Sequence, residues 1–367
     1  MEHELNLRIP GPIPVDDEIL TSMSSQMINH RGPEYKELLY SVTDRLKKVF
    51  ETTSEVFILT ASGTGGMEAA IVNTLSPADK VINASCGSFG ERFGSIASIY
   101  GADVIELKFP YGKAIDLDHL RKTLQENPDT KAVTVTHNET STGVVNNIEK
   151  ISEVVKGEFE SLLLVDGVSS VSSIPVRTDE WNCDVVATAS QKGWGVPPGL
   201  AFFNFSSDAW EAHKNSTMPR YYFDVSMYQS YYKIGQPPFT PALSVMFAMD
   251  LALEKMTTHG MGSIFEHHSN IAKMTREGIK NLGLSLFPDE SVASDTVTAI
   301  NLPEHISWSE LNSTMLNEHN VVLAGGQGSL AGKIFRIGHL GDTPTIEIEE
   351  TLNSLEKALK KLGFKKN

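Results

Sequence analysis

Two side chains in this sequence could together hold a cofactor that reacts through an aldehyde. Lys192 follows a short apolar run, Asp184–Ala189, and the glycines and prolines of Gly193–Gly199 come directly after it. Asp166 ends a second apolar run, Leu162–Val165. A lysine on a stiff turn can form a Schiff base, and a carboxylate at a neighbouring strand end can pair with a ring nitrogen. Pyridoxal phosphate needs both groups.

Arg336 is a candidate for binding a carboxylate of the substrate. It lies in the apolar run Phe335-Arg-Ile-Gly338, and its planar guanidinium can hold a carboxylate at two points. Taken alone, Arg336 is better explained as an edge-strand arginine that reaches water. Lys192 taken alone could be an ordinary solvated lysine, but its place after a buried strand indicates an amine that burial keeps partly neutral.

The segment Ala61–Gly66 is a candidate phosphate-binding turn. Its small residues allow backbone N–H groups to approach an anion at the start of a helix. A plain tight turn explains it equally well. It is no P-loop, because no Gly-Lys-Ser/Thr closes it, and Glu68 stands where a dinucleotide-binding fingerprint needs its third glycine.

Further polar and aromatic side chains follow other expected strands. Phe89 could stack on a planar ring, although on its own it reads as the first core residue of the next helix. Thr140 or Ser141 could cap a helix, and His137 could be a satisfied buried histidine. His267-His268 is not interpreted as a metal site, because adjacent helical residues point in different directions and no third ligand is apparent.

The elements that must position these residues alternate between strands and helices in the first half of the chain. The strands are apolar throughout, which is typical of strands covered on both faces. This pattern predicts an α/β fold with a mainly parallel sheet between helices, and ligands bind beyond the carboxyl ends of such strands. The predicted strands are 56–60, 80–84, 103–107, 132–137, 161–166 and 184–189, and the predicted helices are 66–73, 89–100, 117–125 and 148–155.

The pattern changes after Thr240. Helices are predicted over 241–257, 260–282, 308–318 and 346–362, and strands over 296–301 and 333–337. We therefore expect an N-terminal arm (1–15), a large cofactor-binding domain (16–260) and a smaller C-terminal α+β domain (261–367).

Composition narrows the class of protein. The chain has 367 residues, a formal net charge of −15 and two cysteines. The acidic balance disfavours a nucleic-acid partner, and two cysteines are too few for a disulfide framework, which suits a reducing cytoplasm. The N-terminus is acidic and polar, unlike a signal peptide. No apolar run approaches the ~20 residues that cross a bilayer.

In their order along the chain, these segments resemble the class V group of fold-type-I pyridoxal-phosphate aminotransferases, and within it the alanine–glyoxylate/serine–pyruvate aminotransferases. The resemblance covers nearly the whole sequence. The matching segments are 10–12, 30–34, 62–66, 139–144, 166–170, 190–192, 197–199 and 332–338.

The resemblance implies roles around the cofactor ring. Lys192 would form the Schiff base and Asp166 would keep the pyridine nitrogen protonated. Phe89 would stack on one face of the ring, where relatives often have tryptophan, and Val168 would pack on the other face. Thr140 would hydrogen-bond near the ring hydroxyl.

It also implies how the phosphate is bound. Thr64 and Gly65, together with Gln191, would bind the phosphate of the same subunit's cofactor. Thr240 would reach the phosphate of the neighbouring subunit's cofactor, because the family's active sites lie at a homodimer interface.

For the substrates, the resemblance implies that Arg336 binds the α-carboxylate and that Gly11 lies on the substrate side. The expected reaction moves an amino group from a small amino acid to a 2-oxo acid such as glyoxylate or pyruvate. Alanine, serine and glycine are the first candidates for the donor, and aspartate stays open.

The sequence departs from the family at two positions. Pro237 stands where relatives often have a tyrosine three residues before Thr240, and Tyr231 or Tyr232 could replace it. Asn138 stands where a glycine is frequent. Both changes could alter the mouth of the pocket.

Two alternatives remain. A class V lyase such as a cysteine desulfurase would need a nucleophilic cysteine on a mobile loop, whereas Cys86 and Cys183 lie beside apolar strands. A catalytically silent subunit of the same fold is disfavoured by the intact lysine, aspartate and arginine.

Overall fold

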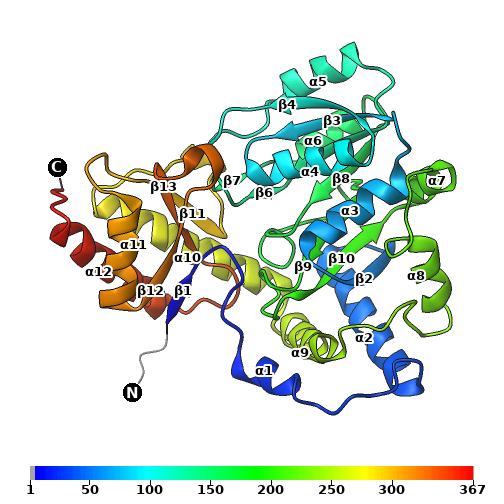
Figure 1. The fold of residues 1–367 in the computed structure, drawn as a ribbon, viewed down its shortest axis with the longest axis horizontal. Helices are drawn as coiled ribbons and strands as arrows, with labels where there is room; N and C mark the ends of the chain where they lie inside the picture. The colour runs from blue at the N-terminus through cyan, green and yellow to red at the C-terminus, as the bar shows by residue number, and fades with distance from the viewer. Residues whose placement is uncertain (1–4, 367) are drawn as a thin grey trace.

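A computed structural model describes residues 5–366. The acidic segment 1–4, interpreted above as unlike a signal peptide, lies outside the described residues. Within the described residues, no helix combines the length and the apolar character that a membrane span requires. Figure 1 shows two parts side by side, each built around its own sheet.

The larger sheet has seven strands, all parallel except one. Strand β10 runs antiparallel to both of its neighbours, β9 and β2, and the other pairs are parallel. In order across the sheet, the strands are β2 (Glu55–Ala61), β10 (Gly199–Phe205), β9 (Val185–Ala189), β8 (Leu162–Asp166), β5 (Ala132–Thr136), β3 (Lys80–Ser85) and β4 (Asp103–Lys108). This arrangement confirms the predicted α/β fold with a mainly parallel sheet.

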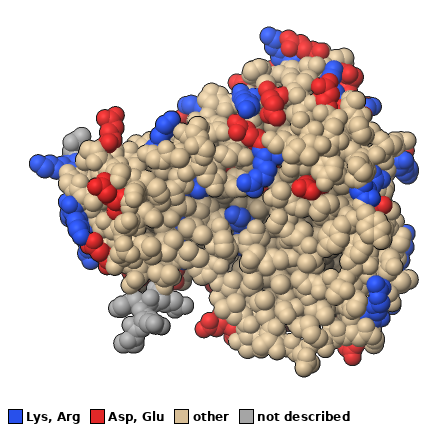
Figure 2. Space-filling view, viewed as in Figure 1, with Lys and Arg blue, Asp and Glu red and all other residues tan. Residues whose placement is uncertain are grey.

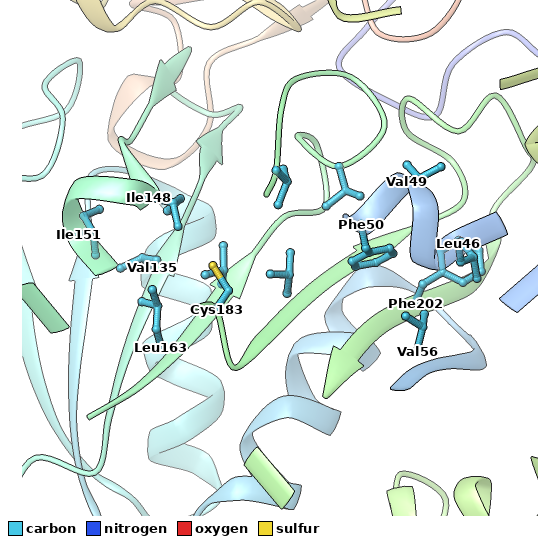
Figure 3. Packing of buried hydrophobic residues seen from close by; sticks show 14 of the residues in the cluster. Leu46, Val49, Phe50, Val56, Val135, Ile148, Ile151, Leu163, Cys183 and Phe202 are labelled. Carbon is cyan, nitrogen blue, oxygen red and sulfur yellow. The ribbon is translucent and has the colours of Figure 1, made fainter. Parts of the chain in front are cut away.

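Helices cover this sheet and close its core. They are α1 (Asp17–Ser22), α2 (Pro33–Phe50), α3 (Gly63–Thr74), α4 (Ser88–Ile99), α5 (Leu117–Glu126), α6 (Ile148–Val155), α7 (Ser207–Asn215), α8 (Val225–Tyr232) and α9 (Leu243–His259). The residues of β5, β8 and β9 are almost all buried, because helices lie on both faces of these strands. Figure 3 shows one side of this core, where Phe50 of α2 packs beside Phe202 of β10.

The smaller sheet has four strands in the order β1 (Asn6–Arg8), β12 (Val321–Gly325), β13 (Ile334–Gly338) and β11 (Val297–Asn301). Helices α10 (Met261–Asn281), α11 (Trp308–His319) and α12 (Thr345–Lys361) accompany it, with two short 3-10 helices, η1 (Glu290–Val292) and η2 (Gly328–Leu330). Figure 1 shows β1 beside β12, so the N-terminal strand joins a sheet formed by the C-terminal part of the chain.

We call residues 16–260 the large unit, and β1 together with residues 261–366 the small unit. The domain boundaries at residues 15 and 260 stay predictions. The structure adds that β1, which belongs to the predicted N-terminal arm, joins the sheet of the small unit. A two-stranded hairpin, β6 (Asn138–Glu139) with β7 (Val144–Val145), projects from the large unit.

Candidate active site

Lys192 lies on the turn after β9, as the sequence predicts. Its amine donates a hydrogen bond to the carbonyl oxygen of Pro10. Gly11 has a φ of +117°, which favours glycine, and a methyl group there would lie 2.6 Å from this amine, so the lysine end would have to move. The predicted substrate-side turn therefore lies directly against the predicted catalytic amine.

Burial shifts the pKa of Lys192. The low-polarity surroundings lower the pKa to about 8; the carboxylate of Asp166 opposes the shift, while the positive charges of Arg336 and Arg92 add to it. The amine therefore exchanges its proton near neutral pH, which a group that must accept and return a proton requires.

Asp166 ends β8 and is buried. Its Oδ1 accepts a hydrogen bond from the backbone N–H of Val168 at 2.9 Å, whereas Oδ2 has only a 3.4 Å bond from the Thr136 hydroxyl. Burial raises the pKa of Asp166 to about 6, and the amine of Lys192 partly offsets this effect. A protonated ring nitrogen at Oδ2 would supply the partner that a buried carboxylate needs.

Val168 and the start of α3 lie together. A methyl group on Gly63 would lie 2.6 Å from a methyl carbon of Val168, so the first turn of α3 packs against this side chain. Thr64 and Gly65 are in that first turn, where backbone N–H groups lack helical partners. The helix start predicted at residue 66 therefore lies three residues earlier.

Gln191 supplies a further polar group beside Lys192. The Oε1 end of its amide is buried and has no hydrogen-bond partner among the described residues. A phosphate is a hydrogen-bond acceptor, so it would bind the Nε2 group of this amide and leave Oε1 for another donor. With the open N–H groups of α3, the residues present fit a phosphorylated cofactor.

Phe89 lies in the first turn of α4 and is partly buried. It belongs to none of the hydrophobic clusters of the described residues, which favours the stacking interpretation over that of a core residue. The Arg92 guanidinium carbon lies 4.8 Å from the centre of its ring. An accessible aromatic face at this position is suited to stacking.

Glu139 was not predicted as a site residue, yet it holds Phe89 in place. Its Oε2 accepts hydrogen bonds from the backbone N–H groups of Phe89 at 3.0 Å and Gly90 at 2.9 Å. Ser141 donates to Oε1 through its N–H at 3.0 Å and its hydroxyl at 2.5 Å. Because the Ser141 hydroxyl also accepts from the N–H of Ser88, the hairpin caps α4.

Arg336 is buried in β13, which lies between β12 and β11. The alternative of an edge-strand arginine reaching water is therefore wrong. Its Nε and Nη2 donate to the Gly325 carbonyl at 3.1 and 2.7 Å, and Nη1 donates to the Thr140 carbonyl at 3.0 Å. These bonds use three of the five N–H donors of a guanidinium, so one on each terminal nitrogen remains for a ligand.

Thr140 is thus brought to Arg336, but through its backbone. The predicted bond from its hydroxyl to the cofactor stays a prediction. Burial lowers the pKa of Arg336 to about 10, and the nearby carboxylate of Glu139 opposes this shift. Figure 2 shows Lys and Arg side chains at the junction between the two units.

Thr240 is not brought to this cluster. It is exposed and lines a separate groove on the large unit with Thr60, Tyr222 and Tyr232. Its predicted role for a neighbouring subunit stays a prediction. Of the two tyrosines considered as substitutes for the family tyrosine, Tyr232 lines this groove and Tyr231 is not among its lining residues.

Histidine and cysteine side chains are placed away from this chemistry. His137 is buried beside Trp181, and its pKa falls to about 4 through burial; its Nδ1 has no partner within residues 5–366, so it is not a fully satisfied histidine. His267 contacts the carbonyl of Thr343. Both cysteines are free and buried, and burial raises the pKa of Cys86 to about 12 and that of Cys183 as well. Neither thiol suits a desulfurase nucleophile.

Comparisons with known proteins agree with this geometry. Residues 18–339 match the family model described as Aminotransferase class-V. A curated relative from Synechococcus, named soluble hydrogenase, small subunit, is 40% identical and covers 99% of this chain and 95% of the relative. The L-aspartate–glyoxylate aminotransferase of Paracoccus denitrificans is 34% identical and covers 97% of this chain and 91% of the relative.

Among solved structures, the alanine–glyoxylate aminotransferase of Nostoc superimposes with a TM-score of 0.94 at 29% identity. The alignment covers 98% of this chain and 96% of that one. This similarity extends over both units and confirms fold type I.

Proposed function

This chain belongs to the class-V aminotransferase family, whose members depend on pyridoxal phosphate, and we propose that it moves the amino group of a small amino acid to glyoxylate or pyruvate. The observation that carries the proposal is the placement of Lys192, Asp166 and Arg336 at one junction, where burial lowers the pKa of Lys192, Asp166 opposes the shift and Arg336 adds to it. The two similar enzymes named above share glyoxylate in their names, which makes it the first acceptor to test.

The cofactor, when bound, supplies an aldehyde that takes up amino groups and a pyridine ring that accepts electron density. In this chain we assign the ring nitrogen to Asp166 Oδ2 and the phosphate to the N-terminus of α3 with Gln191. Phe89 and Val168 would hold the two faces of the ring. The ring-nitrogen assignment uses an oxygen with one long hydrogen bond, and the ring-face assignments use side chains that are partly exposed.

Lys192 is proposed to move the proton. With a pKa near 8, its amine could accept the proton of the substrate's α-carbon and release it again near neutral pH. The carbonyl of Pro10 accepts a hydrogen bond from the amine and so directs it toward the junction.

Arg336 is proposed to bind the α-carboxylate with its two remaining N–H donors. Because the carbonyls of Gly325 and Thr140 already fix the guanidinium plane, little side-chain freedom is lost when the substrate binds. The small donors alanine, serine and glycine need no further charged partner, which is why we place them first.

We further propose a cytoplasmic homodimer with shared active sites. The exposed position of Thr240, away from the Lys192 cluster, supports a role for the neighbouring cofactor. Large apolar side chains are exposed on the large unit, as expected for an interface; they are Leu20, Met27, Ile99, Tyr221, Tyr222 and Ile234. The free thiols of both cysteines support a reducing compartment.

The test is an amino-transfer assay with the purified holoenzyme. L-Alanine, L-serine, glycine and L-aspartate are each offered with pyruvate or glyoxylate, leaving out pairs that only exchange identical products, and both products are quantified. Equal amounts of new keto acid and new amino acid from a small donor would support the proposal. The absence of transfer from every donor to either acceptor, by protein loaded with cofactor, would contradict it.

A further inference from the structure

Asn138 connects the large unit with the small unit through its side chain. Its Nδ2 donates to the Ser169 hydroxyl of the large unit at 2.7 Å and to the Thr296 hydroxyl of the small unit at 2.7 Å. Its Oδ1 accepts from the hydroxyl of Ser294, also in the small unit, at 2.6 Å. Both ends of the amide are therefore occupied.

The surrounding groups complete a closed network. The Ser169 hydroxyl donates to the backbone carbonyl of Asn138 at 2.8 Å, and the N–H of Thr296 donates to the Ser294 hydroxyl at 3.0 Å. The N–H of Ser294 donates to the carbonyl of Gly143 in the β6–β7 turn at 2.8 Å. All four side chains of the network are buried. Fully satisfied buried networks favour one arrangement of the parts they join.

A cleft makes this network important for the junction. Beside Asn138, a cleft of about 940 Å³ separates α10 of the small unit from α6 and Trp181 of the large unit. His137, Ala293 and Asp295, which adjoin the network in sequence, line the cleft. Since the units are not packed together across the cleft, the network at its end holds their relative orientation there.

The network is also close to the substrate-binding candidate. Two residues after Asn138, the Thr140 carbonyl accepts the hydrogen bond from Arg336. On the other side, Ser169 follows Asp166 by three residues. The β6–β7 hairpin thus contacts both Arg336 and the segment that carries Asp166.

We propose that Asn138 is a positioning residue that fixes the small unit, and with it Arg336, relative to Asp166 and Lys192 before the substrate binds. The proposal rests on the proposed function, since Arg336 is taken there as the carboxylate ligand. A glycine at this position could form none of these side-chain bonds. Amino-acid affinity in this chain would therefore depend on Asn138.

The experiment compares the holoenzymes of wild type, Asn138→Gly and Thr296→Val. Valine has nearly the shape of threonine, so Thr296→Val removes only the hydroxyl and with it one hydrogen bond across the junction. For Asn138→Gly we expect a rise of about tenfold in KM for the amino donor, the effect of about one net hydrogen bond, with kcat changed much less. Hydrogen exchange in 294–301 and 334–338 should be faster, with exchange in β8 unchanged. Asn301→Gly is the matched control for KM, because the Asn301 amide bonds within the small unit, to Ser285 and Leu286.

A double variant separates positioning from general loosening. If Asn138 acts through Thr296, the Thr296→Val substitution raises KM less in the Asn138→Gly variant than it does in the wild-type enzyme. Strictly additive effects, or an unchanged KM and unchanged exchange in Asn138→Gly, would overturn the inference. If Asn138→Gly does not fold, Thr296→Val decides by the same two readouts. An inactive wild type would contradict the proposed function, and the exchange measurement would still decide the inference.

Discussion

The amine of Lys192 donates a hydrogen bond to the carbonyl oxygen of Pro10, 182 positions earlier in the chain. The strand before Pro10 belongs to the sheet of the small unit, whereas Lys192 belongs to the large unit. The contact therefore joins the two units at the amine itself and makes the local backbone part of the site.

Replacement of Gly11 by alanine should impair catalysis at this contact. The added methyl group would lie 2.6 Å from the Lys192 amine, and the φ of +117° adds backbone strain. We expect kcat to fall by at least about tenfold, because a displacement of about 1 Å is costly in catalysis. Gly332→Ala is the control, since Gly332 has a φ of +71° but no atom near the added methyl; an equal loss of kcat in both variants would refute the explanation.

Lys192→Ala should lower kcat by about 10²–10⁴-fold, the usual contribution of a positioned proton-transfer group. The exposed Lys150, which pairs with Glu153, provides the control Lys150→Ala. Borohydride reduction of the wild-type holoenzyme and peptide mass mapping should find the cofactor attached at position 192. Attachment at any other lysine would refute the assignment.

Arg336→Lys should raise KM for the amino donor by about 10–100-fold, the value of a charge-assisted hydrogen bond, with a smaller change in kcat. A lysine cannot bond the Gly325 and Thr140 carbonyls and still offer two parallel donors. Saturation kinetics check this, with Arg177→Lys on the exposed surface as control. An unchanged KM would count against Arg336 as the carboxylate ligand.

Asp166→Asn should stabilise the cofactor-free protein in a pH-dependent manner. The folded-state pKa of about 6 lies above the ordinary value of 3.8, so the buried acid adds stability below pH 4 that is lost as pH rises through 6. The gain from asparagine should therefore be about 2–3 kcal/mol larger at pH 8 than at pH 4. Urea unfolding at the two pH values checks this, and an equal gain at both would show that burial does not control this carboxyl.

Glu139→Gln should destabilise the protein by about 2–4 kcal/mol. One end of a glutamine amide cannot accept hydrogen bonds, so either the Phe89 and Gly90 donors or the Ser141 donors lose their acceptor. Glu153→Gln, in an exposed pair, is the control. A loss within ~0.5 kcal/mol of this control would contradict the structural role of Glu139.

The central sheet could be predicted because its strands are buried on both faces and therefore form apolar runs. Helix α6 was predicted with its observed bounds, and β8 was predicted to within one residue. Strands β10 and β12 were not predicted. β10 directly follows the glycine- and proline-rich turn, which hides the start of the strand, and β12 is short and ends in glycine.

The side chains at the junction show where sequence reasoning ends. Lys192 and Asp166 have recognisable surroundings because each follows an apolar strand. Glu139 lies among polar residues and resembles an exposed turn, and its burial arises only because α4 begins beside it. The carbonyl of Pro10 is backbone, so no side-chain pattern could have indicated it.

The pairing of β1 with β12 has a consequence for substrate traffic. Ile9 and Pro10 lie against Gly338, two residues beyond Arg336, so one sheet carries both the carbonyl that accepts the lysine's hydrogen bond and the guanidinium. Any displacement of that sheet would therefore move the Pro10 carbonyl and the Arg336 guanidinium together relative to Lys192, so the spacing of the groups around the substrate depends on one strand pairing.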